Sequence, residues 1–170
     1  GVVGTLIAWL CARIPGTEVE LIDVDAERAA LAAALGLVHR APGAARPECD
    51  LVFHASGNPA GLAQALELAG QEASIIEVSW YGQRNATLAL GAAFHSRRLV
   101  LRASQVGHIT APRAPRWDYR RRLELALALL VDDRLDALIS GEHPFAALPA
   151  LMARLAHTPA GALCERIRYD

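Results

Sequence analysis

The sequence contains no lysine, and all seventeen of its basic residues are arginine. This absence excludes, within these residues, a Walker-type phosphate loop, a Schiff-base intermediate and a catalytic Tyr-x-x-x-Lys pair, because each requires a lysine. Cysteine is also scarce and widely spaced, with only Cys11, Cys49 and Cys164. Without CxxC spacing these residues predict neither a disulfide framework nor a zinc cluster, and we expect each to be a small buried side chain.

Excess charge and long apolar runs are lacking as well. The formal net charge is −1, which argues against a nucleic-acid partner and against binding to an anionic membrane. No apolar run approaches the roughly 18–20 residues of a membrane-spanning helix. Hydrophobic residues make up 53% of the 170 residues, which is enough for one sizeable globular core. No targeting signal is visible, so the cytoplasm is the default expectation.

The first residues read Gly1-Val2-Val3-Gly4, followed by an apolar helix expected over residues 5–14 and a buried strand expected over 19–24. A helix that begins on glycines directs free N–H groups and the positive end of its dipole at a phosphate. Asp23 lies nineteen residues beyond Gly4, near the end of that strand. A dinucleotide fingerprint, G-x-G-x-x-G, places its ribose-binding carboxylate at about this distance. The chain begins at the second glycine of that fingerprint, so we expect a fragment truncated before the first strand.

Strand and helix patterns then alternate along the chain. Further helices are expected over 25–35 and 59–68, and further strands over 37–39, 50–56, 73–79 and 99–103. Such alternation predicts an α/β fold, a Rossmann-like doubly wound parallel sheet with helices on both faces. With the absent first strand, the expected strands number six, as in a complete dinucleotide-binding domain.

The regular alternation of strand and helix patterns ends after Gly107. We expect a loop over 108–116, a long helix over 117–131, a short extended piece over 135–140, a helix over 148–156 and an edge strand over 164–169. We therefore predict a dinucleotide-binding domain over residues 1–138. Residues 139–170 are too few for a core of their own, and we expect this segment to pack on a catalytic domain outside the chain.

The cofactor choice depends on Asp23 and on the residues after it. A carboxylate at this place accepts hydrogen bonds from the ribose hydroxyls and repels a 2′-phosphate. The next residues are neutral or acidic up to Arg28, which lies one helical turn on and is within reach of the adenosine ribose. The pattern favours NAD over NADP, although a solvated helix face is an alternative role for Arg28.

Loops after three successive strands complete the candidate site, because ligands of open parallel sheets bind at the carboxyl ends of the strands. Gly57 permits close approach of the cofactor, and Trp80 or Tyr81 can flank a nicotinamide ring. The backbone of residues 104–107 can bind its carboxamide. A plain turn is the alternative in each case. None of the six histidines stands in a recognised metal-ligand spacing, so no metal ligand and no catalytic residue is assigned.

Together these stretches resemble the medium-chain, zinc-type alcohol dehydrogenase superfamily. The likeness includes Asp-Leu-Val-Phe-His-Ala-Ser-Gly (50–57), Ile-Ile-Glu-Val-Ser-Trp-Tyr-Gly (75–82), residues 94–107 and the Pro144-Phe145 region. It implies cofactor contacts along the glycine turn, at the adenosine ribose and near the nicotinamide: Gly1, Val2, Val3, Gly4, Asp23, Arg28, Ser56, Gly57, Ser104 and Gln105. It also implies a homodimer or homotetramer formed through strand 99–103. The family's GroES-like lobe, with its catalytic zinc, is not represented in these residues.

The resemblance implies an NAD-dependent oxidoreductase that transfers a hydride between the cofactor and an alcohol or carbonyl substrate. Three alternatives remain. A zinc-free quinone reductase belongs to the same superfamily. An S-adenosylmethionine-dependent methyltransferase also uses a glycine turn and an acidic residue after its second strand. A non-catalytic NAD(H)-sensing module would need nothing beyond the binding site.

Overall fold

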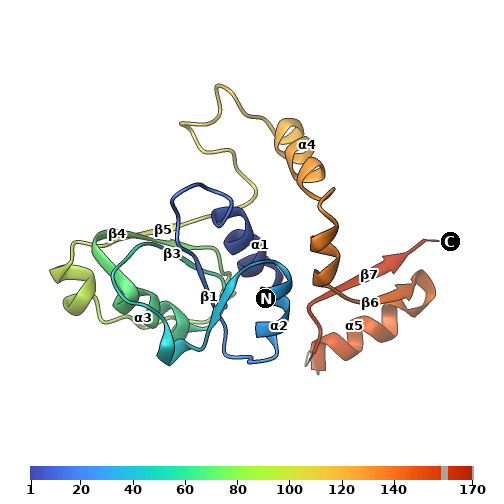
Figure 1. The fold of residues 1–170 in the computed structure, drawn as a ribbon, viewed down its shortest axis with the longest axis horizontal. Helices are drawn as coiled ribbons and strands as arrows, with labels where there is room; N and C mark the ends of the chain where they lie inside the picture. Colours follow the sequence, from blue (N-terminus) through green and yellow to red (C-terminus); the bar gives the residue numbers. More distant parts are fainter. Residues whose placement is uncertain (158–160, 170) are drawn as a thin grey trace.

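A computed structural model describes residues 1–157 and 161–169. Its first half alternates helices and strands: α1 (Val2–Cys11), β1 (Glu20–Ile22), α2 (Arg28–Ala34), β2 (Val38–Arg40), η1 (Pro42–Ala44), β3 (Cys49–His54), α3 (Pro59–Leu68), β4 (Ala69–Glu77), η2 (Leu90–Phe94) and β5 (Val100–Ala103). The second half contains α4 (Tyr119–Leu129), η3 (Asp133–Leu138), β6 (Ile139–Pro144), η4 (Phe145–Ala147), α5 (Leu148–His157) and β7 (Cys164–Arg168). Figure 1 shows these elements in place.

Every strand pairing in the described residues is parallel, which confirms the expected α/β class. The strands form three separate sheets, ordered β1-β2, β3-β4-β5 and β6-β7. In a doubly wound sheet of order 3-2-1-4-5-6, the second and fourth strands do not pair, because the first lies between them. The separation of β1 from β3 follows this order, since the strand that would lie between them is not among the described residues.

Two apolar cores hold the first half together. One core joins α1, β1, α2 and η3 through side chains that include Trp9, Leu21, Leu35 and Leu138. The other joins α3, β4 and the start of β5 through side chains such as Leu66 and Ile75. Helix α2 ends where expected, because Gly36 takes φ +71 directly after the last turn.

The segment around residues 133–144 differs from the extended piece expected over 135–140. It forms the short helix η3 first, and the strand β6 begins only at Ile139. The Asp132 side chain caps η3 by accepting the Arg134 N–H at 3.2 Å. Leu135 and Leu138, three residues apart, both face the core, and this is a helical spacing. The predicted strand near the end of the chain is confirmed as β7, which pairs with β6.

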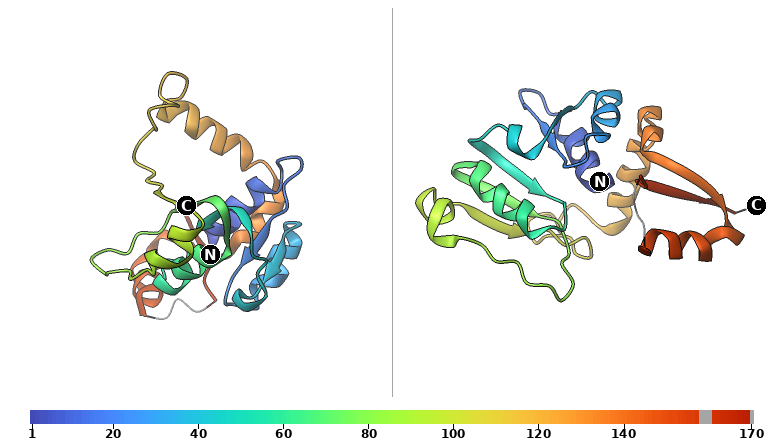
Figure 2. Two further views of the ribbon diagram at one scale, coloured as in Figure 1. Left: turned by 90° about the vertical axis from the view of Figure 1, so that its left-hand side faces the viewer. Right: turned by 90° about the horizontal axis from the view of Figure 1, so that it is seen from below.

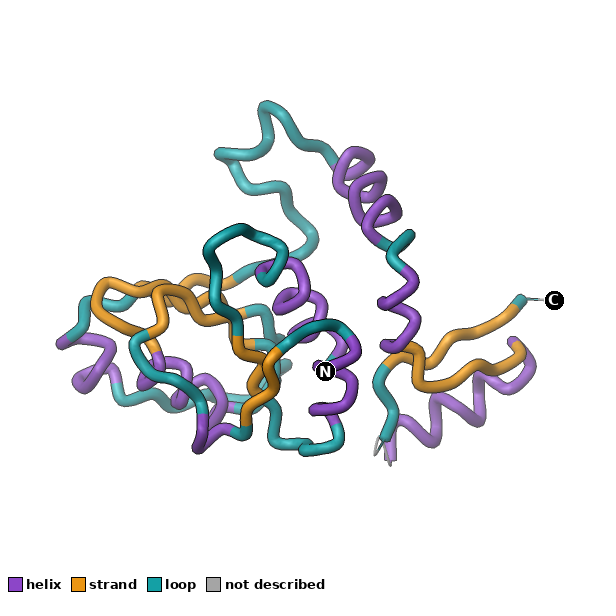
Figure 3. The backbone as a smooth tube through the Cα atoms, in the orientation of Figure 1, coloured by secondary structure: helices purple, strands orange, loops and turns teal. Residues whose placement is uncertain are grey.

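Two parts project from this body. Helix α4 follows a long loop and stands away from the sheets, as the tube in Figure 3 shows, and none of its residues is buried. The C-terminal unit of β6, β7 and α5 forms a small lobe at one end of the molecule, as the second view in Figure 2 shows. The three cysteines are free and half-buried rather than fully buried as expected.

The second core gives a stability prediction. Ile75 is 0% exposed in β4, so Ile75→Ala leaves a cavity and should reduce the free energy of unfolding by about 2–5 kcal/mol. Val24→Ala is the matched control, since Val24 is 87% exposed, and should stay within about 0.5 kcal/mol of the parent protein. Urea unfolding measures both. Equal losses for the two variants would contradict this assignment of the core.

Candidate functional site

Helix α1 begins at Val2 and not at residue 5 as expected, so the glycine turn of residues 1–4 is the first turn of this helix, and it lies between the carboxyl ends of β1 and β3. The amino group of Gly1 is 3.3 Å from Oδ2 of Asp23, directly after β1. A Cβ added at Gly4 would lie 3.5 Å from Cβ of Ala55, directly after β3. The structure therefore brings together three of the regions that the sequence singled out: the turn, the acidic end of β1 and the loop containing Ser56.

The beginning of α1 offers backbone donors at this place. The first hydrogen bond of the helix runs from the Thr5 N–H to the Gly1 carbonyl at 3.0 Å. The N–H groups of Val2, Val3 and Gly4 precede it and have no acceptor within the helix. Together with the helix dipole, they form an anion-binding end of the kind that holds a pyrophosphate.

Asp23 is an ionised acceptor beside this helix end. Burial acts to raise the pKa of its carboxyl, whereas the Asp25 N–H, which donates to Oδ1 at 3.0 Å, and the nearby Arg28 act to lower it. The side chain is 19% exposed, so it is shielded but reachable from solvent. A carboxylate in this state suits the hydroxyl donors of a ribose.

Arg28 lies in α2, and its charge acts to lower the pKa of Asp23, although its direct contacts are with other groups. Its Nε is 3.3 Å from Oδ2 of Asp25, and its Nη2 donates to the carbonyl of Ala162 at 3.4 Å. The guanidinium thus links α2 to the segment that leads into β7. An adenosine ribose contact, as the resemblance implies for Arg28, would have to share the group with these two partners.

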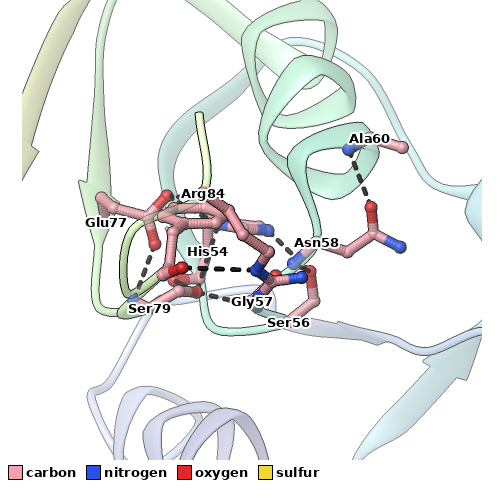
Figure 4. Close-up of polar contacts among 9 residues, drawn as sticks. His54, Ser56, Gly57, Asn58, Ala60, Glu77, Ser79 and Arg84 are labelled. Atoms are coloured by element: carbon pink, nitrogen blue, oxygen red, sulfur yellow. Dashed lines mark hydrogen bonds and ion pairs between the residues drawn. The ribbon is translucent and has the colours of Figure 1, made fainter. Parts of the chain in front are cut away.

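A polar network that the sequence analysis did not identify occupies the carboxyl ends of β3 and β4 (Figure 4). His54 is its centre and is 5% exposed. Its Nδ1 lies 2.8 Å from Oε2 of Glu77, and its Nε2 lies 2.7 Å from Oγ of Ser56. The Ser79 N–H donates to the other carboxylate oxygen at 2.7 Å, and the Tyr81 hydroxyl donates to Oε2 at 3.0 Å.

The network keeps Glu77 charged. Burial acts to raise the pKa of this carboxyl, but hydrogen bonds from the Ser79 N–H and from His54 outweigh it, so the pKa falls below its ordinary value of 4.5. Burial, together with the hydrogen bond to Glu77, raises the pKa of Tyr81 to about 12. An ionised Glu77 and a protonated Tyr81 are therefore the states at neutral pH.

The loops on either side of the network are tied to each other. The Gly57 N–H donates to Oγ of Ser79 at 3.0 Å, and Nη2 of Arg84 donates to the Gly57 carbonyl at 3.3 Å. These bonds fix the loop after β3 against the loop after β4. Trp80, in the loop after β4, is 89% exposed.

The loop after β5 joins the same edge. The Ser104 N–H donates to the Glu77 carbonyl at 2.8 Å, which extends the pairing of β5 with β4 by one residue. The Gln105 side chain turns back on its own loop and accepts the Gly107 N–H at 2.6 Å. Apart from Arg28 in α2, the candidate cofactor residues therefore lie at or near the carboxyl ends of parallel strands or at the beginning of α1.

The register of the sheet explains why the network was missed. His54 and Glu77 are opposite partners in the pairing of β3 with β4, so they lie side by side although 23 residues apart. The usable signal was a histidine and a glutamate, each two residues before the end of its expected strand, 50–56 or 73–79. The described residues contain no group of three or more metal-binding side chains. Nor does any helix among them have the length and apolar character to cross a membrane.

Comparison with known proteins adds to this geometry. No protein-family model matches the sequence, and no curated protein matches it. Solved structures match in fold: L-idonate 5-dehydrogenase from Escherichia coli has a TM-score of 0.76 at 21% identity, covering 99% of this chain and 48% of its own. A zinc-binding-domain alcohol dehydrogenase protein from Burkholderia ambifaria has a TM-score of 0.72 at 21% identity, covering 100% and 46%.

A third match carries a cofactor. A short chain alcohol dehydrogenase from Escherichia coli, solved with NADH, has a TM-score of 0.69 at 16% identity, covering 98% of this chain and 49% of its own. The chain thus spans about half the length of these proteins. At such identities the likeness establishes the fold: an α/β, Rossmann-like fold shared with half of each of these dehydrogenases.

The charged state of Glu77 gives a pH prediction. Its folded-state pKa lies below 4.5, so the carboxylate stabilises the fold above that pH, and this contribution is lost as the pH falls through the depressed value. Glu77→Gln should lower stability at neutral pH and weaken the loss of stability in acid. Glu67→Gln, at an exposed site on α3, is the control. Urea unfolding over a pH series measures the effect, and parallel curves for the parent protein and Glu77→Gln would refute it.

Proposed function

We propose that this chain binds NAD and positions it for hydride transfer in an oxidoreductase of the zinc-type alcohol and polyol dehydrogenase superfamily. The observation that carries the proposal is the placement of Asp23 beside the first N–H groups of α1, with Gly1 3.3 Å away. A ribose acceptor and a pyrophosphate-binding helix end at this separation are the two halves of a dinucleotide site. The dehydrogenases that share the fold, one of them bound to NADH, support it.

The charges around Asp23 favour NAD over NADP. An NADP site needs a cation for the 2′-phosphate, whereas the loop after β1 contributes Asp23, Asp25 and Glu27. Arg28, the basic residue that follows, is already paired with Asp25 at 3.3 Å. A phosphate entering here would therefore meet carboxylates and a guanidinium whose charge is partly neutralised.

Bound NAD would supply the hydride acceptor, and the residues of this chain would hold and orient it. Val2 and Val3 offer N–H groups to the pyrophosphate, Asp23 accepts from the adenosine ribose, and Ser56 lies further along the same edge. The substrate in this proposal is a small alcohol or carbonyl compound. Any catalytic zinc would be bound outside the described residues, which contain no cluster of ligands for it.

Cofactor titration of the full-length protein tests the proposal. Calorimetry should show NADH binding more tightly than NADPH, and both more tightly than S-adenosylmethionine. Preference for S-adenosylmethionine would replace the dehydrogenase proposal with a methyltransferase. Preference for NADPH would refute the proposed role of Asp23 as a ribose acceptor that repels a 2′-phosphate.

The residue-level test is Asp23→Asn. A hydrogen bond to a charged group contributes about 1.5–3 kcal/mol, so the variant should bind NADH about 10- to 100-fold more weakly and discriminate less against NADPH. Glu27→Gln, on the same loop and exposed, removes a charge without the ribose contact and should leave the affinity for NADH nearly unchanged. Equal losses of NADH affinity in the two variants would mean that Asp23 acts only through its negative charge and not through a hydrogen bond to the ribose.

We further propose a homodimer or homotetramer formed through β5. Within the described residues β5 pairs with β4 alone, and its apolar side chains Val100 and Leu101 are 46% and 36% exposed. An apolar edge of this kind invites pairing with a second copy. Leu101→Arg should shift the mass measured by light scattering toward the monomer, whereas Val24→Arg should not. An unchanged assembly would remove β5 from the interface.

A further inference from the structure

We propose that Ser56 is an activated nucleophile, with His54 as its general base and Glu77 as the group that orients the base, and that this site accepts acyl groups from small activated esters. The proposal concerns an activity distinct from hydride transfer. It rests on two contacts in series: Ser56 Oγ to His54 Nε2 at 2.7 Å, and His54 Nδ1 to Glu77 Oε2 at 2.8 Å. These are the contacts that define a serine–histidine–acid triad, whatever the order of its members along the chain.

The proton positions fit this role. Glu77 accepts hydrogen bonds from the Ser79 N–H and the Tyr81 hydroxyl, and as a carboxylate it takes the Nδ1–H of His54. That bond selects the tautomer whose Nε2 carries a lone pair, and this lone pair faces Ser56 Oγ. The Ser56 hydroxyl then donates to Nε2, which is the arrangement needed for proton removal during attack.

Burial is arranged as in a working triad. The His54 side chain is 5% exposed and the Glu77 side chain 13% exposed, so base and acid are shielded from water. Ser56, in the loop after β3, is exposed, so the nucleophile faces solvent where a substrate can arrive. Figure 4 shows Ser56 and Glu77 on opposite sides of His54.

Gly61, in α3, leaves the space that the contact requires. A Cβ at this position would lie 2.6 Å from Ser56 Oγ and 2.8 Å from His54 Nε2. An alanine there would therefore push directly against both partners of the hydrogen bond. The absence of a side chain at Gly61 is thus matched to the serine–histidine pair.

Hydrolysis of an ester at this site needs no reagent other than water. Ser56 Oγ attacks the ester carbonyl carbon, its proton passes to His54 Nε2, and the carbon–oxygen bond to the leaving alcohol breaks as that alcohol takes the proton from His54. Water then attacks the carbonyl carbon of the acyl-serine and gives a proton to His54. The bond between that carbon and Ser56 Oγ breaks, Oγ takes the proton from His54, and the acid leaves. Arg84, whose Nη2 is 3.3 Å from the Gly57 carbonyl, supplies positive charge on the neighbouring loop for the developing oxyanion.

The experiment treats the full-length protein with a fluorophosphonate probe, which phosphonylates activated serines with loss of fluoride, and locates the adduct by mass spectrometry. We expect it on Ser56, together with release of p-nitrophenol from p-nitrophenyl acetate. Ser56→Ala should lose both. His54→Gln should slow both by at least about 100-fold, the usual contribution of a general base. The lack of lysine in these residues removes one source of non-specific acylation.

Two further variants sharpen the test. Ser96→Ala removes another exposed serine, whose hydroxyl bonds only to the Ala92 carbonyl at 3.1 Å among the contacts described, and should leave labelling unchanged. Gly61→Ala keeps all three triad side chains but crowds the serine–histidine contact, and should slow labelling in protein that circular dichroism shows to be folded. An unlabelled Ser56 in the parent protein, or hydrolysis that persists in Ser56→Ala, would overturn the proposal and leave the network a structural one.

Added NADH separates this proposal from the cofactor site. If the dinucleotide runs past Ser56, saturating NADH should protect it from the probe. Labelling of Ser56 that NADH does not affect would support the nucleophile and contradict the placement of cofactor there. Calorimetric binding of NADH without any labelling would support the cofactor site and contradict the nucleophile.

Discussion

The parallel pairing of β3 with β4 is the constraint on which the site depends. It places His54 opposite Glu77 and makes both strands end at the same edge. The loops that follow then meet, and their backbone and side chains satisfy the buried polar groups that the strands bring there. A shift of the register by one residue would turn His54 to the other face of the sheet and leave an unpaired carboxylate behind. The strand register that buries apolar side chains such as Ile75 therefore also places His54 beside Glu77 at the end of the sheet.

The cofactor half of the site depends on a different element, the first turn of α1. This helix is in contact with both groups of strands: Trp9 lies in the core that contains β1, while Gly4 approaches Ala55 after β3. Asp23, held by the Asp25 N–H, completes an arrangement of backbone donors and one carboxylate. Neither half needs lysine, and the arginine nearest Asp23 along the loop is engaged with Asp25 and Ala162. The charges after β1 and the pairing of Arg28 thus both support the proposal that the cofactor is NAD.

Much of this could be predicted from local patterns. The glycine turn, the acidic strand end and the alternation of elements indicated the parallel α/β fold, because each depends on neighbours in sequence. The predictions failed where the local structure depends on contacts with residues that are distant in sequence. Residues 135–140 looked extended, but the Asp132 cap and the two core-facing leucines produce a helix first. His54 looked like an ordinary histidine, because its partner Glu77 becomes adjacent only when two strands pair. All the cofactor contacts assigned from the sequence, from Gly1 and Asp23 to Ser104 and Gln105, stay predictions.

The place of α1 also bears on cooperativity. Within the described residues, β1 and β4 belong to separate apolar cores, and α1 contacts both β1 and β3. A ligand that contacts both Asp23 and Ser56 would connect the two cores, and it would make the local opening of either one more costly.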